Sequence, residues 1–137
     1  MKEQLISYNT AILADKCKVS VDLQPSTIWT DKGILTNLDT LSETLYFYVA
    51  PTQSLLEKWL REKHKLISRI IPVPWNQDSF KYYCEIYELY IDPITSGRKN
   101  MVIQLGYEDQ MDRKYHNTYE DALESALYKM LTFIKLK

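Results

Sequence analysis

The fold is decided by residues 80–92, which read FKYYCEIYELYID. Over 80–87 every second side chain belongs to one apolar row, and a period of two is typical of a β-strand. The next segment, DPITSG at 92–97, is rich in turn-forming residues, and the alternation returns over 99–106. We therefore expect a β-hairpin over about 80–105.

Amphipathic helices are predicted on both sides of this hairpin. Apolar residues of 118–135 recur with the helical period, acidic residues stand at its start and basic ones at its end, as the helix dipole favours. A second helix is expected over 52–65, capped by Thr52, with one apolar stripe that includes Leu55 and Trp59. A shorter helix is expected over 7–17. The stripes of the two long helices should cover one sheet face.

Two further β segments complete the predicted fold. Residues 27–36 hold two β-prone runs around a glycine-containing turn and predict a small hairpin. Residues 67–73 predict a strand that ends at Pro72 and Pro74. Together the segments predict one α+β domain over 1–137, in which about three helices pack on an antiparallel sheet of about four or more strands.

The composition favours a cytoplasmic globular protein. The chain has 137 residues, 45% of them hydrophobic, with 17 Lys and Arg against 18 Asp and Glu. This balance argues against intrinsic disorder and against a general attraction to nucleic acid or acidic membranes. The first residues lack an apolar signal region, and no apolar run is long enough to cross a membrane.

The two cysteines are expected to be reduced. Cys17 and Cys84 would form a disulfide in an oxidising compartment, but in a cytoplasmic protein free, partly buried thiols are the better interpretation.

Residues 50–62, APTQSLLEKWLRE, resemble a family of small uncharacterised proteins carried by phages, prophages and integrative elements of gut anaerobic bacteria. Three more segments are similar to that family, at 7–11, 83–87 and 118–124. The resemblance implies an origin in a mobile element and an α+β fold, and it implies no catalytic residue. Residues 17–19, Cys-Lys-Val, depart from the family, which tends to close the first helix with a glycine and an aromatic residue.

We expect no metal site, no cofactor and no catalytic residue. The sequence lacks the metal-ligand spacings CxxC, HxxxH and HExxH, and its three glycines are isolated rather than grouped in a phosphate-binding loop. A small hydrolase is the third alternative for the function, since a thiol beside a histidine, or a pair of acids, would suit such chemistry. The candidate acids are Glu85, Glu88, Asp109 and Asp112.

Nucleic-acid binding is the second alternative. The basic residues of 58–69 would form the phosphate-binding patch, beside aromatic residues on which bases would stack. Against it, 107–124 carries an excess of acidic residues that would repel phosphate. The proposed basic patch comprises Lys58, Arg61, Lys65 and Arg69.

Protein interaction is the favoured function, through a non-enzymatic accessory module. Eleven tyrosines and three tryptophans are many for this length, and aromatic residues left outside a core are typical of interfaces. The partner would be another protein, or a second copy of the chain if the basic segment 58–69 pairs with the acidic segment 107–124. The candidate interaction residues are Trp75, Tyr83 and Tyr87.

Overall fold

The computed structural model describes residues 4–23, 25–37, 46–91, 100–105 and 115–136. The helices are α1 (Tyr8–Lys16), α2 (Val19–Asp22), α3 (Gln53–His64) and α4 (Tyr119–Leu136). The strands are β1 (Thr27–Thr30), β2 (Leu35–Asn37), β3 (Phe47–Val49), β4 (Leu66–Asn76), β5 (Ser79–Ile91) and β6 (Asn100–Leu105).

The strands form two antiparallel sheets, with the orders β2-β1-β3 and β4-β5-β6. The α+β class and both predicted hairpins are therefore confirmed, β1 pairing with β2 and β5 with β6. One expectation is wrong: within the described residues the strands do not share one sheet of four or more, and each of the two sheets has three. The alternation of a strand shows which side chains share a face, but it does not show which strands are neighbours.

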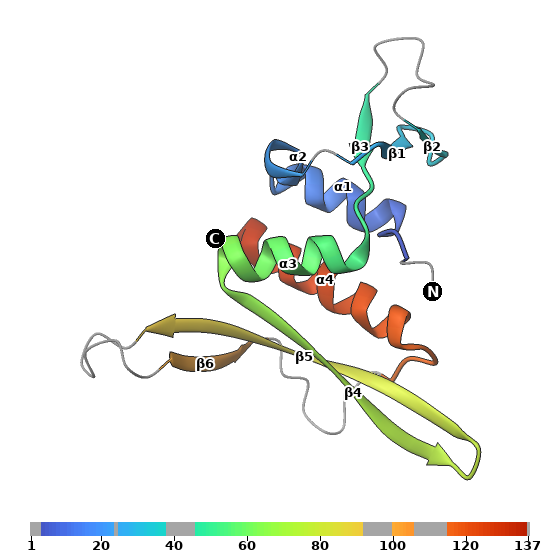
Figure 1. Ribbon diagram of the computed structural model, residues 1–137, viewed down its shortest axis with the longest axis vertical. Coiled ribbons are helices and arrows are strands. Elements are labelled where there is room, and N and C mark those ends of the chain that lie inside the picture. The colour runs from blue at the N-terminus through green and yellow to red at the C-terminus, as the bar shows by residue number, and fades with distance from the viewer. Residues whose placement is uncertain (1–3, 24, 38–45, 92–99, 106–114, 137) are drawn as a thin grey trace.

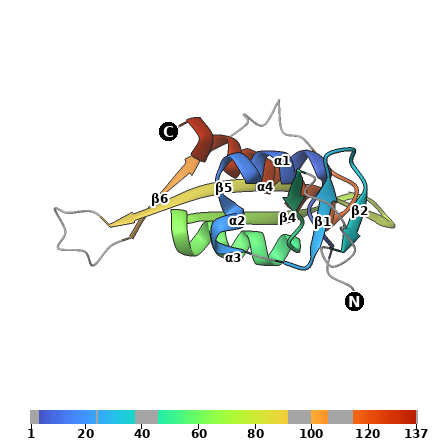
Figure 2. The same cartoon turned by 90° about the horizontal axis from the view of Figure 1, so that it is seen from above.

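The elements stack in layers (Figure 1). Strands β4 and β5 form the lower layer, and α3 and α4 lie next to each other across one face of it, in contact with the strands. Helix α1 packs on α4 from the opposite side, and the small sheet lies beyond α1 (Figures 1 and 2). The long helices cover one sheet face, as their stripes predict.

The core lies between these layers. It is built from leucines, alanines and a methionine of α4, from the stripe of α3, from apolar residues of α1, and from single residues of both sheets. The prediction that Leu55 belongs to the buried stripe of α3 is wrong, because its side chain is 39% exposed. The inward apolar residues of this helix are Leu56, Trp59 and Leu60. The fully or nearly buried members of α3, α4 and the sheet are Leu56, Trp59, Leu60, Leu66, Ile86, Ala122, Leu123, Ala126, Leu127, Met130 and Leu131.

Strand β4 continues through its two prolines, which we expected to end it. Pro72 lies opposite Tyr82 in the register, and Pro74 lies opposite Phe80. The backbone N–H and C=O of Tyr82 both bond to His116, on the side of β5 away from β4. The nitrogen of Pro72 therefore faces the edge of β4 on which none of the described strands pairs, so the missing donor breaks none of the described ladder bonds.

The predicted cap of α3 is confirmed, because the Thr52 hydroxyl accepts the Leu55 amide. At the start of α1 the Ser7 hydroxyl accepts the Thr10 amide. The sequence did not predict α2, a single turn that follows Lys18. Lys18 has a left-handed backbone with φ 62°, a conformation that a residue with a side chain seldom adopts.

Candidate interaction surface

The side of β4 and β5 that faces away from α3 and α4, here called the outer face, carries apolar and aromatic side chains together with three charged ones. Register partners share a face, so each pair adds one row across the two strands. No helix in the described parts of the chain lies on this face. The rows are Ile67 with Tyr87, Arg69 with Glu85, Ile71 with Tyr83, and Val73 with Lys81.

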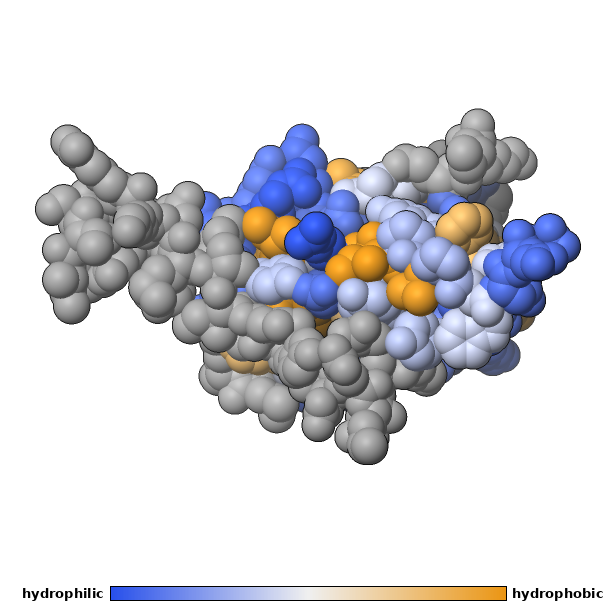
Figure 3. All heavy atoms as spheres, turned by 90° about the horizontal axis from the view of Figure 1, so that it is seen from below, coloured by the Kyte–Doolittle hydropathy of each residue, from blue (hydrophilic) through white to orange (hydrophobic). Residues whose placement is uncertain are grey.

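Figure 3 views the molecule from this side. Hydrophobic residues, in orange, lie directly beside paler and more polar ones on the visible part of the surface. Ile67, Ile71 and Val73 are partly exposed, and Arg69 between them is exposed. The outer face is thus an apolar strip with a charged row inside it.

An aromatic cluster closes the end of the outer face near the β4–β5 turn. The bridge between Tyr82 and His116 places Tyr115 beside Tyr83, and their ring centroids are 6.1 Å apart. Tyr115 also contacts Trp75, with centroids 5.2 Å apart, and the ammonium of Lys81 lies 4.7 Å from the centre of the Trp75 ring. A cation over an indole ring is a favourable contact that holds both side chains in place.

The hairpin turn itself presents large hydrophobic side chains to solvent. Trp75 is 51% exposed and Phe80 is 57% exposed. The hairpin extends past the start of α4, so its tip stands away from the helical layer (Figure 1). Exposed aromatic residues on a projecting hairpin are typical of a contact surface.

The predicted aromatic residues Trp75, Tyr83 and Tyr87 lie together on the outer face. Sequence reasoning missed the apolar residues between them, although the period of two over 67–75 would have placed these residues on the same side. It also missed Tyr115 and Lys81. Tyr115 joins the cluster through a pairing between distant segments, for which the sequence carries no local signal.

The predicted basic residues divide between two surfaces. Lys58 and Arg61 lie one turn apart on the exposed side of α3, and Lys65 is the exposed C-cap of the same helix. Arg69 is on the outer face, opposite Glu85. Three of the four predicted basic residues therefore lie together on α3, and the fourth, Arg69, lies opposite Glu85 in the sheet.

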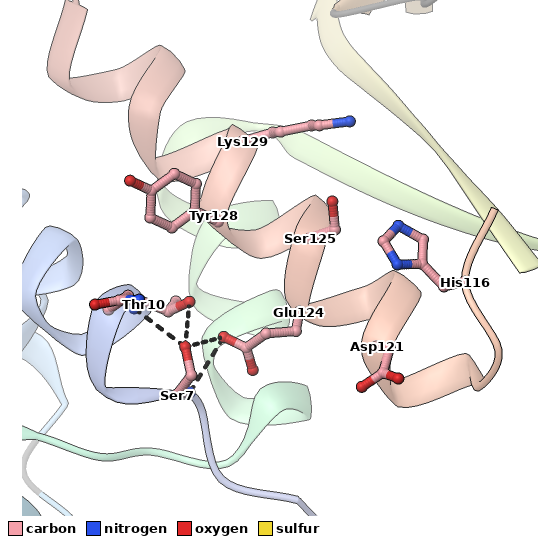
Figure 4. A pocket seen from close by; sticks show the side chains of 9 residues that line it. Ser7, Thr10, His116, Asp121, Glu124, Ser125, Tyr128 and Lys129 are labelled. Carbon is pink, nitrogen blue, oxygen red and sulfur yellow. Dashed lines mark hydrogen bonds between the residues drawn. The ribbon is translucent and has the colours of Figure 1, made fainter. Parts of the chain in front are cut away.

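A polar pocket of about 490 Å³ lies between the start of α1 and α4 (Figure 4). Its centre is Glu124, whose Oε2 accepts hydrogen bonds from the Ser7 amide and hydroxyl at 3.2 and 3.1 Å. Gln53 donates to the other carboxylate oxygen at 3.0 Å. The lining residues are Ser7, Asn9, Thr10, His116, Asp121, Glu124, Ser125, Tyr128 and Lys129.

In this arrangement Glu124 has a structural role, because it links α4 to Ser7 and Gln53. Figure 4 shows its carboxylate turned toward Ser7 and away from His116. The start of a helix attracts anions, and here a side chain of the same chain occupies that position. We therefore regard this pocket as a joint between helices.

The other groups considered for chemistry are arranged as follows. The Cys17 thiol donates to the Leu131 carbonyl at 3.4 Å. Burial raises the pKa of this thiol, although Lys135 acts in the opposite direction, and the raised pKa disfavours the reactive thiolate. Cys17 and Cys84 form no disulfide bond. Glu85 and Glu88, three residues apart on one strand, point to opposite faces. Asp109 and Asp112 lie outside the described residues, within which no three metal-ligating side chains cluster.

Comparison with protein-family models, with curated proteins and with solved structures finds no match to this chain. Within the described residues, none of the helices combines the length and the apolar character needed to span a bilayer.

Proposed function

We propose that the protein is a non-enzymatic interaction module that binds another protein through the outer face of β4 and β5. The observation that carries this proposal is the row pattern of the face, in which Ile71 and Tyr83 stand at the centre and no described helix covers them. The face of a sheet that meets solvent usually carries polar side chains. Apolar and aromatic side chains on such a face therefore indicate contact with another molecule.

The aromatic cluster supports the same proposal. Tyrosine and tryptophan are enriched at interfaces because they bring a large contact area with few rotatable bonds. Trp75 and Tyr83 are already positioned by Tyr115 and Lys81, so little conformational freedom is lost when a partner binds. An origin in a phage or integrative element, a cytoplasmic location and reduced thiols belong to the same proposal.

The test is photocrosslinking from inside cells. A benzoylphenylalanine replaces Tyr83 on the outer face, and the matched control replaces Tyr128, an exposed tyrosine of α4. We expect protein adducts from position 83 and none from position 128. The substitution Ile71→Asp, in the neighbouring strand, should remove those adducts. Equal labelling from both positions would refute the outer face as the contact surface.

Nucleic-acid binding is the second candidate, favoured by the placement of Lys58, Arg61 and Lys65 on one exposed side of α3. Fluorescence anisotropy with single- and double-stranded DNA and RNA tests it at about 50 and about 200 mM salt, where phosphate contacts weaken steeply. Salt-sensitive binding that the triple substitution of these bases to alanine abolishes would support this candidate over the first. No binding at low salt would exclude it.

A further inference from the structure

From the charge pattern of the outer face we infer that its partner is a second copy of this chain, packed face to face; this inference rests on the proposed function. An interface with two-fold symmetry uses the same surface on both subunits, so that surface must be complementary to itself. The outer face meets this condition, because Arg69 on β4 and Glu85 on β5 are register partners.

The geometry of two aligned hairpins makes the pairing explicit. With a two-fold axis running along the hairpin, each residue of β4 meets its own register partner on β5 of the second copy. Arg69 then faces Glu85, and Glu85 faces Arg69. The central row places Ile71 against Tyr83 twice. No like charges meet, and Lys81 keeps its contact with Trp75 in its own chain.

Competing arrangements are less favourable. Addition of a strand to the edge of β4 would require backbone donors, and Pro72 and Pro74 remove two of them. A nucleic acid on the outer face would meet the Glu85 carboxylate in the same row as Arg69, which weakens attraction to phosphate. Face-to-face packing of two copies satisfies both the apolar rows and the charged row.

The size of the surface predicts a weak dimer. Strand β4 has 11 residues, which at about 3.4 Å per residue gives a length of about 37 Å. Two strands are together about 10 Å wide, so the area of the face is on the order of 400 Å². A standard interface buries roughly 800 Å² per partner, which is twice this area. We therefore expect micromolar association that depends on protein concentration.

The experiment uses charge exchange in sedimentation velocity, with protein from about 5 to about 500 µM. The wild type should shift from monomer toward dimer. Arg69→Glu alone places Glu against Glu, and Glu85→Arg alone places Arg against Arg, so each should raise the dimer Kd at least about tenfold. An equimolar mixture of the two variants restores both pairs and should dimerise nearly as the wild type does.

The control is Arg61→Glu, a charge reversal of an exposed residue on α3, which should leave the dimer Kd unchanged. Thermal unfolding verifies that all variants fold. The inference is overturned if the wild type stays monomeric at every concentration, if the single variants dimerise like the wild type, or if their mixture fails to associate.

Crosslinking separates this failure from failure of the proposed function. If the wild type is monomeric and position 83 forms adducts with a different protein, the second copy is refuted while the interaction function stands. If the wild type is monomeric and position 83 forms no adduct, both are refuted.

Discussion

Glu124 of α4 binds Ser7, the N-cap of α1, through two hydrogen bonds to one carboxylate oxygen. The Ser7 amide is a helix-terminal donor without a partner inside the helix, and a negative charge there also complements the helix dipole. Because Gln53 of α3 donates to the other oxygen, one carboxylate connects three helices that are far apart in the sequence.

The first prediction concerns the stability of this joint. Glu124→Ala should lower the free energy of unfolding by about 2–3 kcal/mol, since it leaves the Ser7 and Gln53 donors without their charged acceptor. Glu124→Gln keeps the shape but removes the charge and one acceptor, and should cost about 1–2 kcal/mol. Urea unfolding at neutral pH measures both.

The matched control for Glu124 is Glu62→Gln on the exposed side of α3, which should change the stability by less than about 0.5 kcal/mol. If Glu124→Gln were as harmless as this control, the carboxylate would not be the link between the helices.

The second prediction concerns two strained lysines. Lys18 and Lys65 have φ values of 62° and 58°, where a side chain is unfavourable and glycine is not. Lys18→Gly and Lys65→Gly should each stabilise the fold by up to about 1 kcal/mol, measured as a rise in Tm. The control, Lys58→Gly at an exposed position inside α3, should destabilise it by about 1 kcal/mol. A fall in Tm for both lysine variants would contradict the assigned backbone.

The helices could be predicted from sequence closely because their signals are local. Thr52 acts as a cap where the sequence places it, and the apolar period of α4 sets its buried side. The length of β4 could not be predicted, because whether Pro72 ends a strand depends on whether the strand lies at an edge. The division into two sheets likewise depends on pairings between distant segments.

The candidate surface was predictable only in part. Tyr83 and Tyr87 differ by four residues on one strand, so their common face follows from the period of two. Closeness in the sequence groups Arg69 with Lys58, whereas the register places Arg69 opposite Glu85 on a different surface. Basic residues that are close together in the sequence thus lie on two different surfaces of the folded protein.

The third prediction concerns pH. Hydrogen bonds from Lys63 and then from Trp59 hold the pKa of Asp22 below its ordinary value of 3.8, with burial opposing them. The folded protein therefore binds this proton less readily than the unfolded chain does. The stabilisation by ionised Asp22 is present above about pH 5 and is lost as pH falls through the lowered pKa.

Asp22→Asn should remove this component of the pH dependence. The stability difference between wild type and variant should be largest at neutral pH and should shrink below about pH 4, in urea titrations followed by tryptophan fluorescence. Because the contact with Lys63 is exposed, about 1 M salt should also reduce the difference. A difference that is constant from neutral to acidic pH would show that the charge of Asp22 has no role.

The fourth prediction concerns the edge of β4 that faces away from β5. Pro72 and Pro74 stand at alternate positions, so both lack a donor on the side that faces away from β5. The double substitution of these prolines to threonine returns two outward N–H groups beside the hydrophobic residues of the hairpin, and should promote aggregation through added strands. Light scattering during incubation at high concentration measures it, and Pro25→Thr, in the connection before β1, is the control with the same chemical change. A double variant that stays as dispersed as this control would mean that side chains, rather than missing donors, protect the edge.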